Sequence, residues 1–362
     1  MKIPAIYTNT QSSLYDPLRE KTHQPPALLD LDFNGTDELT STQNQMSSNL
    51  AIMYRQMVSG AKTTRLFFGE PYRAGGEPEP GFGSIENTPH GPVHRWTGDL
   101  KTQEDMGVFY SAARDPIFYA HHANVDRMWT IWKTLPKGRR TEFTDRDWLE
   151  ASFLFYDENA NPVRVKVKDC LDNRKLGYVY QDVDIPWLKA KPKPKKLSKK
   201  LAAAATTNTF GRGGVALAAE KKKKKLTPAS AFPLVLDKVI STQVPRPRKS
   251  RSKKEKEEEE EVLVIDGIEY DKNEAVKFNV YVNDEDDESP PSPDNTEFAG
   301  GFVNVPHKHG KKKGKTCLRL GLTDLLEDLG SEDDDTVVVT LVPKYGQGLV
   351  NIGGIKIEFL KD

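Results

Sequence analysis

The sequence predicts a mixed α and β chain, with a helical first part, a few short strands after it and a β-sandwich or barrel at its C-terminal end. Three observations predict this order. Apolar residues recur at helical spacing before residue 146, β-branched runs separated by turn residues fill positions 228–362, and a stretch rich in Lys, Pro and Ala lies between them. With 362 residues the chain is long enough for two hydrophobic cores.

Changes in composition divide the chain into four expected segments. Residues 1–146 form the helical part, and residues 147–188 add strands that are expected to pack on it. Residues 189–227 hold Lys-Pro repeats, an alanine run and five successive lysines, which is the composition of a linker. Residues 228–362 form the β domain. Its expected strands lie within 232–240, 262–265, 276–282, 298–305, 317–322, 337–342 and 355–359.

The overall charge is balanced, with 53 Lys+Arg and 53 Asp+Glu. A net charge near zero predicts no strong affinity for nucleic acid or for a membrane surface. No apolar run approaches the ~20 residues that cross a bilayer, so no transmembrane segment is expected. Cys170 and Cys317 are far apart in the sequence and are expected to be free thiols.

The first long helix is expected to start after Thr40 or Ser41, either of which can cap it, and to stop at Gly60. Spacings of three and four residues place four apolar side chains on one face of this helix. They are Met46, Leu50, Met53 and Met57.

A first pair of histidines follows a predicted helix start. Thr88 is suited to the N-cap and Pro89 to the first helical position. His90 and His94 then lie one turn apart on one face, where two imidazoles can reach one metal ion. Two histidines at this spacing also occur by chance, so this pair alone does not establish a metal site.

A second pair of histidines lies in the segment Asp115–Trp129, whose helix is expected to start at Asp115-Pro116 and to run to Leu135. Two adjacent rows of side chains along this helix are both apolar, so both faces are expected to be buried. Periodicity therefore does not show which of His121 and His122 would be the ligand. Core histidines held by hydrogen bonds are the ordinary alternative. Four of the seven histidines fall within about 33 residues on two aromatic-rich helices, which favours metal. Three imidazoles suit copper, zinc or iron.

These motifs resemble those of a known family. HxxxH followed by DPIFYAHHANVDRMW is similar to the copper B motif of tyrosinases and plant polyphenol oxidases. Asp147-Trp148-Leu149 resembles the family's middle "DWL" segment, and residues 276–280 its C-terminal "KFDV" domain, with Asn279 where the family has Asp. The resemblance implies the copper B half of a type-3 copper helical bundle followed by a β domain. It covers essentially the whole chain.

The resemblance also implies roles for the histidines. His90, His94 and His122 match the three copper B ligands, and His121 matches the adjacent histidine that does not bind copper. Asn124 and Asp126 match the polar pair that follows, which is expected to orient the helix and its ligands. Tyr178 and Tyr180 match a YxY motif near the end of the catalytic domain.

Four further residues match positions that surround the copper in the family. Phe109 corresponds to an aromatic gate above the metal, with an ordinary core aromatic as the alternative. Glu86 corresponds to a carboxylate that holds a water, although an acid at a helix start also suits the helix dipole. Gly91 and Arg95 lie where the family tunes diphenol against monophenol use, and Gly91 is not the Asn associated with monophenol hydroxylation.

The resemblance implies that the full-length parent oxidises o-diphenols (catechols) to o-quinones with O2 and two copper ions. Only one site is expected here, because the remaining histidines, His23, His307 and His309, do not form a second helical triad. The chain is therefore expected to be a fragment without the copper A region, and inactive or weakly active alone. The alternatives are a noncatalytic remnant or interaction module and an oxygen-carrier-like copper protein.

The expected partners are small diphenols and O2, and no nucleic acid. The C-terminal domain is expected to pack on the catalytic domain. The resemblance implies a place in the chloroplast, in the thylakoid lumen, although no transit peptide is visible in this sequence.

Overall fold

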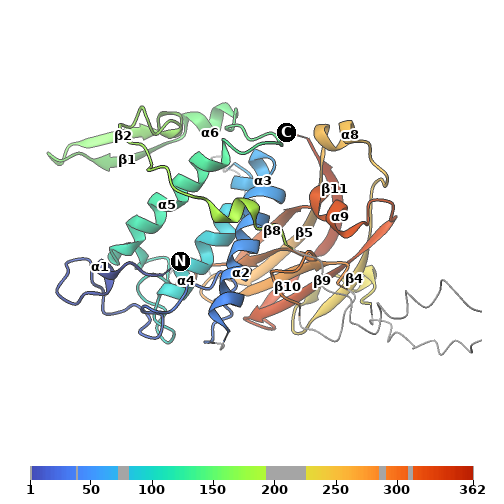
Figure 1. Cartoon of the computed structure of the whole chain (residues 1–362), viewed down its shortest axis with the longest axis horizontal. Coiled ribbons are helices and arrows are strands. Elements are labelled where there is room, and N and C mark those ends of the chain that lie inside the picture. The colour runs from blue at the N-terminus through green and yellow to red at the C-terminus, as the bar shows by residue number, and fades with distance from the viewer. Residues whose placement is uncertain are drawn as a thin grey trace, which may run out of the picture.

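The computed structural model describes residues 2–37, 40–71, 81–192, 226–284, 291–308 and 313–361. Helices carry most of the N-terminal half, and strands carry the C-terminal part, beside them in Figure 1. The expected linker 189–227 lies largely outside the described residues. Both cysteines are free thiols. No described helix is long and apolar enough to cross a membrane.

The first long helix begins where the sequence predicts. α2 (Thr42–Tyr54) has Ser41 as its N-cap, whose side chain accepts a hydrogen bond from the Asn44 N–H, and it continues as η1 (Arg55–Ser59) up to Gly60. Met53 and Met57 are buried, but Met46 is 49 % exposed, so the predicted apolar face is buried only in its second half. The short helices α1 (Ala5–Thr8) and α3 (Thr64–Phe68) flank this element.

One histidine helix is short and the other has 16 residues, and each follows an irregular turn. η2 (Glu86–His90) leads into α4 (Gly91–Thr97), with Thr88 in an extended conformation. η3 (Ala112–Arg114) precedes α5 (Ile117–Trp132), of whose 16 residues only His121, Met128 and Trp132 are buried. The prediction that both faces of this helix are buried was therefore wrong: Tyr119 and Ala123 lie on an exposed face.

The segment after the helices forms an antiparallel hairpin. α6 (Arg146–Glu150) leads into β1 (Ser152–Tyr156), which pairs with β2 (Pro162–Lys166). The hairpin extends away from the other elements in Figure 1, and no residue of either strand is buried. These strands were predicted but do not pack on the helices as expected. The single-turn helices η4 (Val167–Cys170) and η5 (Pro186–Lys189) follow.

The C-terminal strands form two antiparallel sheets. One has the order β11-β5-β10-β3, with β8 also paired to β5, and the other has the order β4-β9-β6-β7. The described strands leave both sheets open, so the sandwich alternative holds and a closed barrel does not. The strands are β3 (Leu234–Val235), β4 (Ile240–Pro245), β5 (Glu260–Asp271), β6 (Lys277–Val282), β7 (Phe298–Val303), β8 (Lys313–Gly321), β9 (Thr336–Tyr345), β10 (Val350–Ile352) and β11 (Gly354–Leu360).

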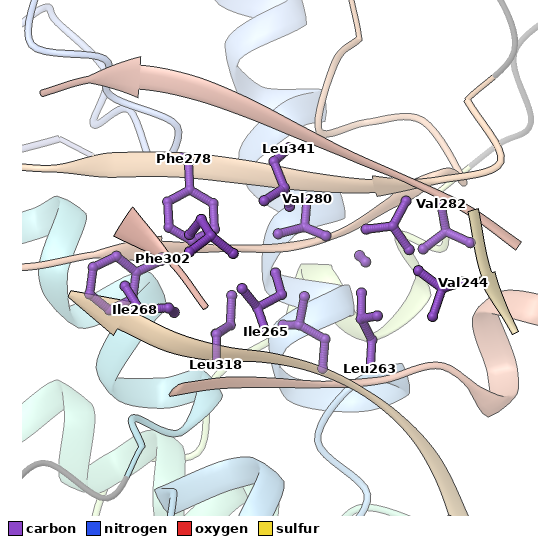
Figure 2. Close-up of a cluster of buried hydrophobic side chains, with 14 of the residues drawn as sticks. Val244, Leu263, Ile265, Ile268, Phe278, Val280, Val282, Phe302, Leu318 and Leu341 are labelled. Carbon is purple, nitrogen blue, oxygen red and sulfur yellow. The ribbon is translucent and has the colours of Figure 1, made fainter. Parts of the chain in front are cut away.

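The core of the sandwich lies between these two sheets. Phe278 and Val280 point from one sheet toward Leu263 and Ile265 of the other (Figure 2), and all four are fully buried. Burial of apolar area of this kind is the main stabilising contribution to a β-sandwich. The short helices η7 (Ala229–Ala231), α8 (Lys253–Glu258) and α9 (Thr323–Leu329) lie in connections of the sandwich and were not predicted.

Hydrogen bonds and ion pairs join the helical part to the sandwich. The Lys277 ammonium donates to Asp32 Oδ1 at 2.9 Å and to the Phe33 carbonyl at 3.0 Å. Arg55 donates to the Thr296 carbonyl at 3.0 Å. Tyr281 and Phe298 of the sandwich belong to the apolar core of the helical part. Residues on the two sides of the linker therefore share one buried boundary.

Candidate metal centre

Four imidazoles meet where the two histidine helices approach each other. The His90 and His94 rings lie 4.6 Å apart, measured between centroids. The His122 ring lies 5.2 Å from His90 and 5.3 Å from His94, and His121 lies 5.4 Å and 5.1 Å from the same two rings. The structure thus brings together all four histidines that the sequence singled out.

Packing of α5 explains how its histidines reach this place. At its C-terminal end, Trp132 is fully buried, stacks on Phe67 at 4.4 Å and donates its indole N–H to the Ala61 carbonyl at 2.7 Å. At its N-terminal end, the Ile117 N–H donates to Asp115 Oδ1 at 2.8 Å, which caps the helix. Both ends of the helix are therefore held.

Each imidazole is oriented by a backbone carbonyl. His94 Nδ1 lies 2.7 Å from the Met106 carbonyl, and His122 Nδ1 lies 2.8 Å from the Phe118 carbonyl. The rings of His90 and His121 also form hydrogen bonds with backbone, at Glu86 and His90 respectively. A neutral imidazole that donates one N–H to a carbonyl keeps a lone pair on its other nitrogen for a metal.

The protonation of the cluster suits metal binding as well. Burial lowers the pKa of His90 to about 4 and the pKa of His94 to about 3, and it lowers the pKa of His121 and of His122 in the same direction. The nearby histidines add to the effect on His90, His94 and His121 by mutual repulsion. All four imidazoles are thus neutral at pH 7 and available as ligands.

Among the described residues, the three rings whose nitrogens converge are those of His90, His94 and His121, whereas the resemblance implied His122 as the third ligand. One nitrogen each from His90, His94 and His121 lies within 4.8 Å of the others, and His121 Nε2 is buried with no hydrogen-bond partner. His122 Nε2 lies 3.2 Å from His90 Nε2. A buried imidazole nitrogen without a partner is costly unless an ion or another polar group satisfies it. The donor set therefore fits a copper, zinc or iron ion.

Glu86 contacts the histidine cluster through its backbone, whereas Phe109 contacts Pro306 and His307 of the C-terminal part. The Phe109 side chain is 65 % exposed, which rules out the core alternative, and its ring stacks on His307 with centroids 4.5 Å apart. Its N–H donates to the Pro306 carbonyl at 2.8 Å. Glu86 lies in the first turn of η2, where its backbone meets the His90 ring. The Phe118 ring lies 3.9 Å from the His122 ring, measured between centroids.

Asn124 and Asp126 follow His122 on α5, and Asp126 bonds to two tyrosines. Asp126 Oδ2 accepts hydrogen bonds from the hydroxyls of Tyr178, at 2.8 Å, and Tyr180. These bonds tie α5, one turn beyond His122, to the tyrosine pair. Asn124 is half-buried on the same helix.

Gly91 and Arg95 face the β-sandwich. A Cβ on Gly91 would lie 2.6 Å from Val303 Cγ1, so a larger residue here requires the Val303 side chain or its strand to shift. Arg95 is buried, and its guanidinium lies 5.6 Å from the Tyr345 ring centroid. Both residues are therefore covered by C-terminal strands in this structure.

Several residues that hold the histidine helices were not singled out from the sequence. Arg19 pairs with Asp115, and the His23 ring stacks on Trp96, which lies two residues after His94. Asp115 was noted only as a helix start. Arg19 carried no local signal, because its partner is 96 residues away.

A cluster of neutral imidazoles on two helices is the arrangement of a metal-binding protein, and comparison with known families places this one in the tyrosinase class. The common central domain of tyrosinase matches residues 2–135. The polyphenol oxidase middle domain matches residues 142–193, and the chloroplastic polyphenol oxidase C-terminal domain matches residues 232–359.

Individual relatives agree with these domain matches. A chloroplastic polyphenol oxidase of Malus domestica is 62 % identical over 99 % of this chain and 60 % of the relative. Aureusidin synthase of Antirrhinum majus is 53 % identical over 99 % of this chain and 62 % of the relative. The structure of latent apple tyrosinase superimposes with a TM-score of 0.89 at 60 % identity, over 100 % of this chain and 74 % of that one.

The chain belongs to the plant polyphenol oxidase family. Family membership implies copper as the metal, which chemistry alone left open between copper, zinc and iron. The chain spans about 60 % of the length of the curated relatives it matches.

Proposed function

We propose that this chain carries the copper B half of a polyphenol oxidase whose full-length form oxidises o-diphenols to o-quinones with O2. The observation that carries the proposal is the convergence of four neutral, buried or half-buried imidazoles on two adjacent helices. The relatives named polyphenol oxidase support copper-dependent oxidation of phenols. In this proposal the helical part ends near residue 146, the strand segment near residue 188 and the linker near residue 227.

His90, His94 and His122 would hold the copper ion, with His121 beside them. Copper, when bound, supplies a one-electron redox change and a Lewis-acidic position for a phenol oxygen. Conversion of a catechol to an o-quinone removes two electrons and two protons. A single ion that cycles between two oxidation states accepts only one electron, so the activity of the parent needs a second copper site.

The protein's own residues prepare this site for a ligand. Carbonyls of Met106 and Phe118 orient His94 and His122, so the imidazoles need not rearrange when the metal binds. The Tyr178 and Tyr180 hydroxyls donate to Asp126 and hold the middle of α5. Asn124 would help to orient the same turn. Glu86 would hold a water beside the ion, and Phe109 would guide an aromatic substrate.

The lack of a side chain at Gly91 would favour diphenols over monophenols, and Arg95 would tune the same choice. In this arrangement Val303 and Tyr345 cover both positions, and His307 covers Phe109. We therefore expect the β-sandwich to restrict access in the parent. Cleavage within residues 189–227 of the parent should raise its activity toward a diphenol; unchanged activity after removal of residues 228–362 would contradict this.

The relatives from Malus domestica, Vicia faba and Vitis vinifera are named chloroplastic. We propose a chloroplast location for the parent as well, with the thylakoid lumen as its compartment. Fractionation of chloroplasts with an antibody to the β-sandwich tests this, and recovery in the stroma would exclude the lumen.

The metal proposal is tested by copper content and oxygen uptake of the purified full chain. We expect one copper per chain, lost in His94→Ala and retained in His307→Ala, which removes an imidazole outside the cluster. With 4-methylcatechol we expect no sustained oxygen uptake. Two coppers per chain or robust turnover would contradict the one-site proposal.

A noncatalytic role is the second candidate for this chain, because the described residues assemble one histidine cluster. An interaction module or an oxygen-carrier-like protein would keep the copper without forming quinone. Reversible oxygen binding without quinone production by the full-length parent would favour the oxygen-carrier candidate over the oxidase.

A further inference from the structure

Residues 14–37, called here the N-terminal brace, contact both histidine helices. The loop of residues 98–116 is the covalent connection between the end of α4 and the start of α5. A loop of this length does not by itself fix the distance between two helices. The brace supplies contacts at both of these helix ends.

At the start of α5, the brace contributes a buried ion pair. Arg19 Nε donates to Asp115 Oδ2 at 2.7 Å, and Nη2 donates to Oδ1, so the guanidinium grips both carboxylate oxygens. The two side chains are 1 % and 0 % exposed. Arg19 Nη2 also donates to the Leu14 carbonyl at 2.8 Å, which fixes the guanidinium within the brace. Because the Ile117 N–H bonds to the same carboxylate, Arg19 holds the first turn of α5 in its place against the brace.

At the end of α4, the brace meets Trp96 and Thr97. The Glu20 N–H donates to the Thr97 carbonyl at 3.0 Å. The backbone of Arg19 forms an isolated antiparallel β-bridge with Gly98. The His23 ring lies parallel to Trp96 with centroids 4.3 Å apart, and its Nδ1 contacts the Trp96 carbonyl. His23 Nε2 is held by Asp37 at 2.7 Å. The same short segment is thus anchored to both helices.

We propose that Arg19 and Asp115 are a positioning pair that sets the separation of the two histidine pairs, and thereby the copper affinity and coordination geometry of the cluster. This inference rests on the proposed copper site. His121 and His122 lie six and seven residues after Asp115 on α5, whereas His90 and His94 belong to η2 and α4. A small displacement at the cap therefore moves one pair of imidazoles relative to the other.

The fork geometry explains why an arginine is required. A planar guanidinium contacts both carboxylate oxygens and the Leu14 carbonyl together, which a point-charged ammonium does not. Loss of groups that orient metal ligands typically lowers metal affinity by about 10–100-fold. We expect a loss of that size in Arg19→Met.

A matched control separates positioning from general destabilisation. Arg246 pairs with Glu261 through two bonds, Nε–Oε1 at 2.8 Å and Nη2–Oε2 at 3.0 Å, with side chains 3 % and 2 % exposed. Arg246 directly follows β4 and Glu261 lies on β5, so the pair belongs to the C-terminal part. Arg246→Met therefore removes a similarly buried bidentate pair without touching the brace, while Arg251 Nη1 remains 3.9 Å from Glu261 Oε2.

The experiment measures Cu(II) affinity of the full chain by competition with a chelator, and the EPR hyperfine splitting of the bound ion. Arg19→Met should weaken affinity about 10–100-fold and change the EPR spectrum. Arg246→Met should lose comparable stability with wild-type affinity and spectrum. Equal affinity and equal spectra for Arg19→Met and wild type would overturn the inference.

Two additional variants keep the test informative if Arg19→Met folds poorly. Asp115→Asn keeps an oxygen that caps α5 but removes the ion pair, so affinity should fall although the helix start remains. Arg19→Met/Asp115→Asn should recover stability relative to the single variants, because no buried charge is left unpaired, without recovery of affinity. Recovery of both would show a merely structural role.

The same measurements distinguish this inference from the proposed function. If the wild-type chain binds no copper, the copper site is refuted, and the positioning role with it. If the wild type binds copper and Asp115→Asn binds it equally well with an unchanged spectrum, only the positioning role is refuted.

Discussion

The β-sandwich and the histidine-bearing part of the chain are built in opposite ways. Every residue of β6 and the first six residues of β5 are buried, whereas α5 buries three of its 16 residues and the β1–β2 hairpin buries none. The sandwich encloses the larger apolar core. The helical part has a smaller apolar core and adds buried polar contacts, Arg19–Asp115 within it and Asp32–Lys277 at its boundary with the sandwich. The larger apolar core and the histidine cluster therefore lie in different regions of the described chain.

This difference has a physical reason. A metal site needs imidazole nitrogens with unshared lone pairs, and such groups are costly in a closed apolar core. In His94 and His122, one ring nitrogen bonds to a backbone carbonyl, which leaves the other nitrogen available for a metal. The helix α5 that carries His122 is only partly buried. The sandwich has no such requirement, and its inner faces are filled by apolar side chains.

The largest expected effect tests the core of the sandwich. Phe302 is fully buried and packs against Phe278, Phe82 and Tyr270, with ring centroids 5.4–5.9 Å away. Phe302→Ala should lower the free energy of unfolding by about 3–5 kcal/mol, because it removes apolar area and leaves a cavity. Denaturant titration measures this, with the half-exposed Val235→Ala as control. A loss below about 1 kcal/mol would contradict the contrast between the regions.

A smaller effect should appear at the boundary between the regions. Burial raises the pKa of Glu260 to about 7, and Lys62, with its Nζ 4.0 Å from Oε2, offsets only part of this. The folded state therefore holds a proton that the unfolded state releases near pH 4.5. The associated stabilisation is fully present below pH 4.5 and is lost as the pH rises through 7, by on the order of 3 kcal/mol. Unfolding free energies measured between pH 4.5 and 8 test this.

Glu260→Gln provides the control for that pH dependence. Glutamine keeps the oxygen that accepts from the Thr323 N–H at 3.1 Å but does not titrate. Its unfolding free energy should fall less between pH 4.5 and 8 than that of the wild type. Identical slopes for the two proteins would show that Glu260 is ionised throughout this range.

The smallest effect is expected in the β1–β2 hairpin. Phe155 and Tyr156 are exposed, at 60 % and 76 %, so Phe155→Ser should change the free energy of unfolding by less than about 0.5 kcal/mol. Denaturant titration of the purified chain, beside Phe302→Ala, measures the difference. A loss of about 2 kcal/mol or more would show that another surface covers the hairpin in solution.

Most of the secondary structure followed from local pattern, and the errors have identifiable causes. The run 262–265 was predicted as a strand, but β5 continues to Asp271 because β8 and β11 pair with it along its length. The hairpin was predicted from alternating valines, and alternation does not reveal whether any surface lies opposite it. Likewise, the apolar stripes of α5 did not reveal that one face is open.

The sequence by itself determined the histidine spacing, the helix starts at Ser41 and Asp115, the run of C-terminal strands and the family. All of these depend on residues within one or two turns of each other, or on motifs that can be read directly. Tertiary structure alone decided that Arg19 grips Asp115, that Lys277 reaches Asp32 over 245 positions, and that Val303 lies against Gly91. Contacts between distant residues depend on how whole elements pack, and no local pattern encodes them.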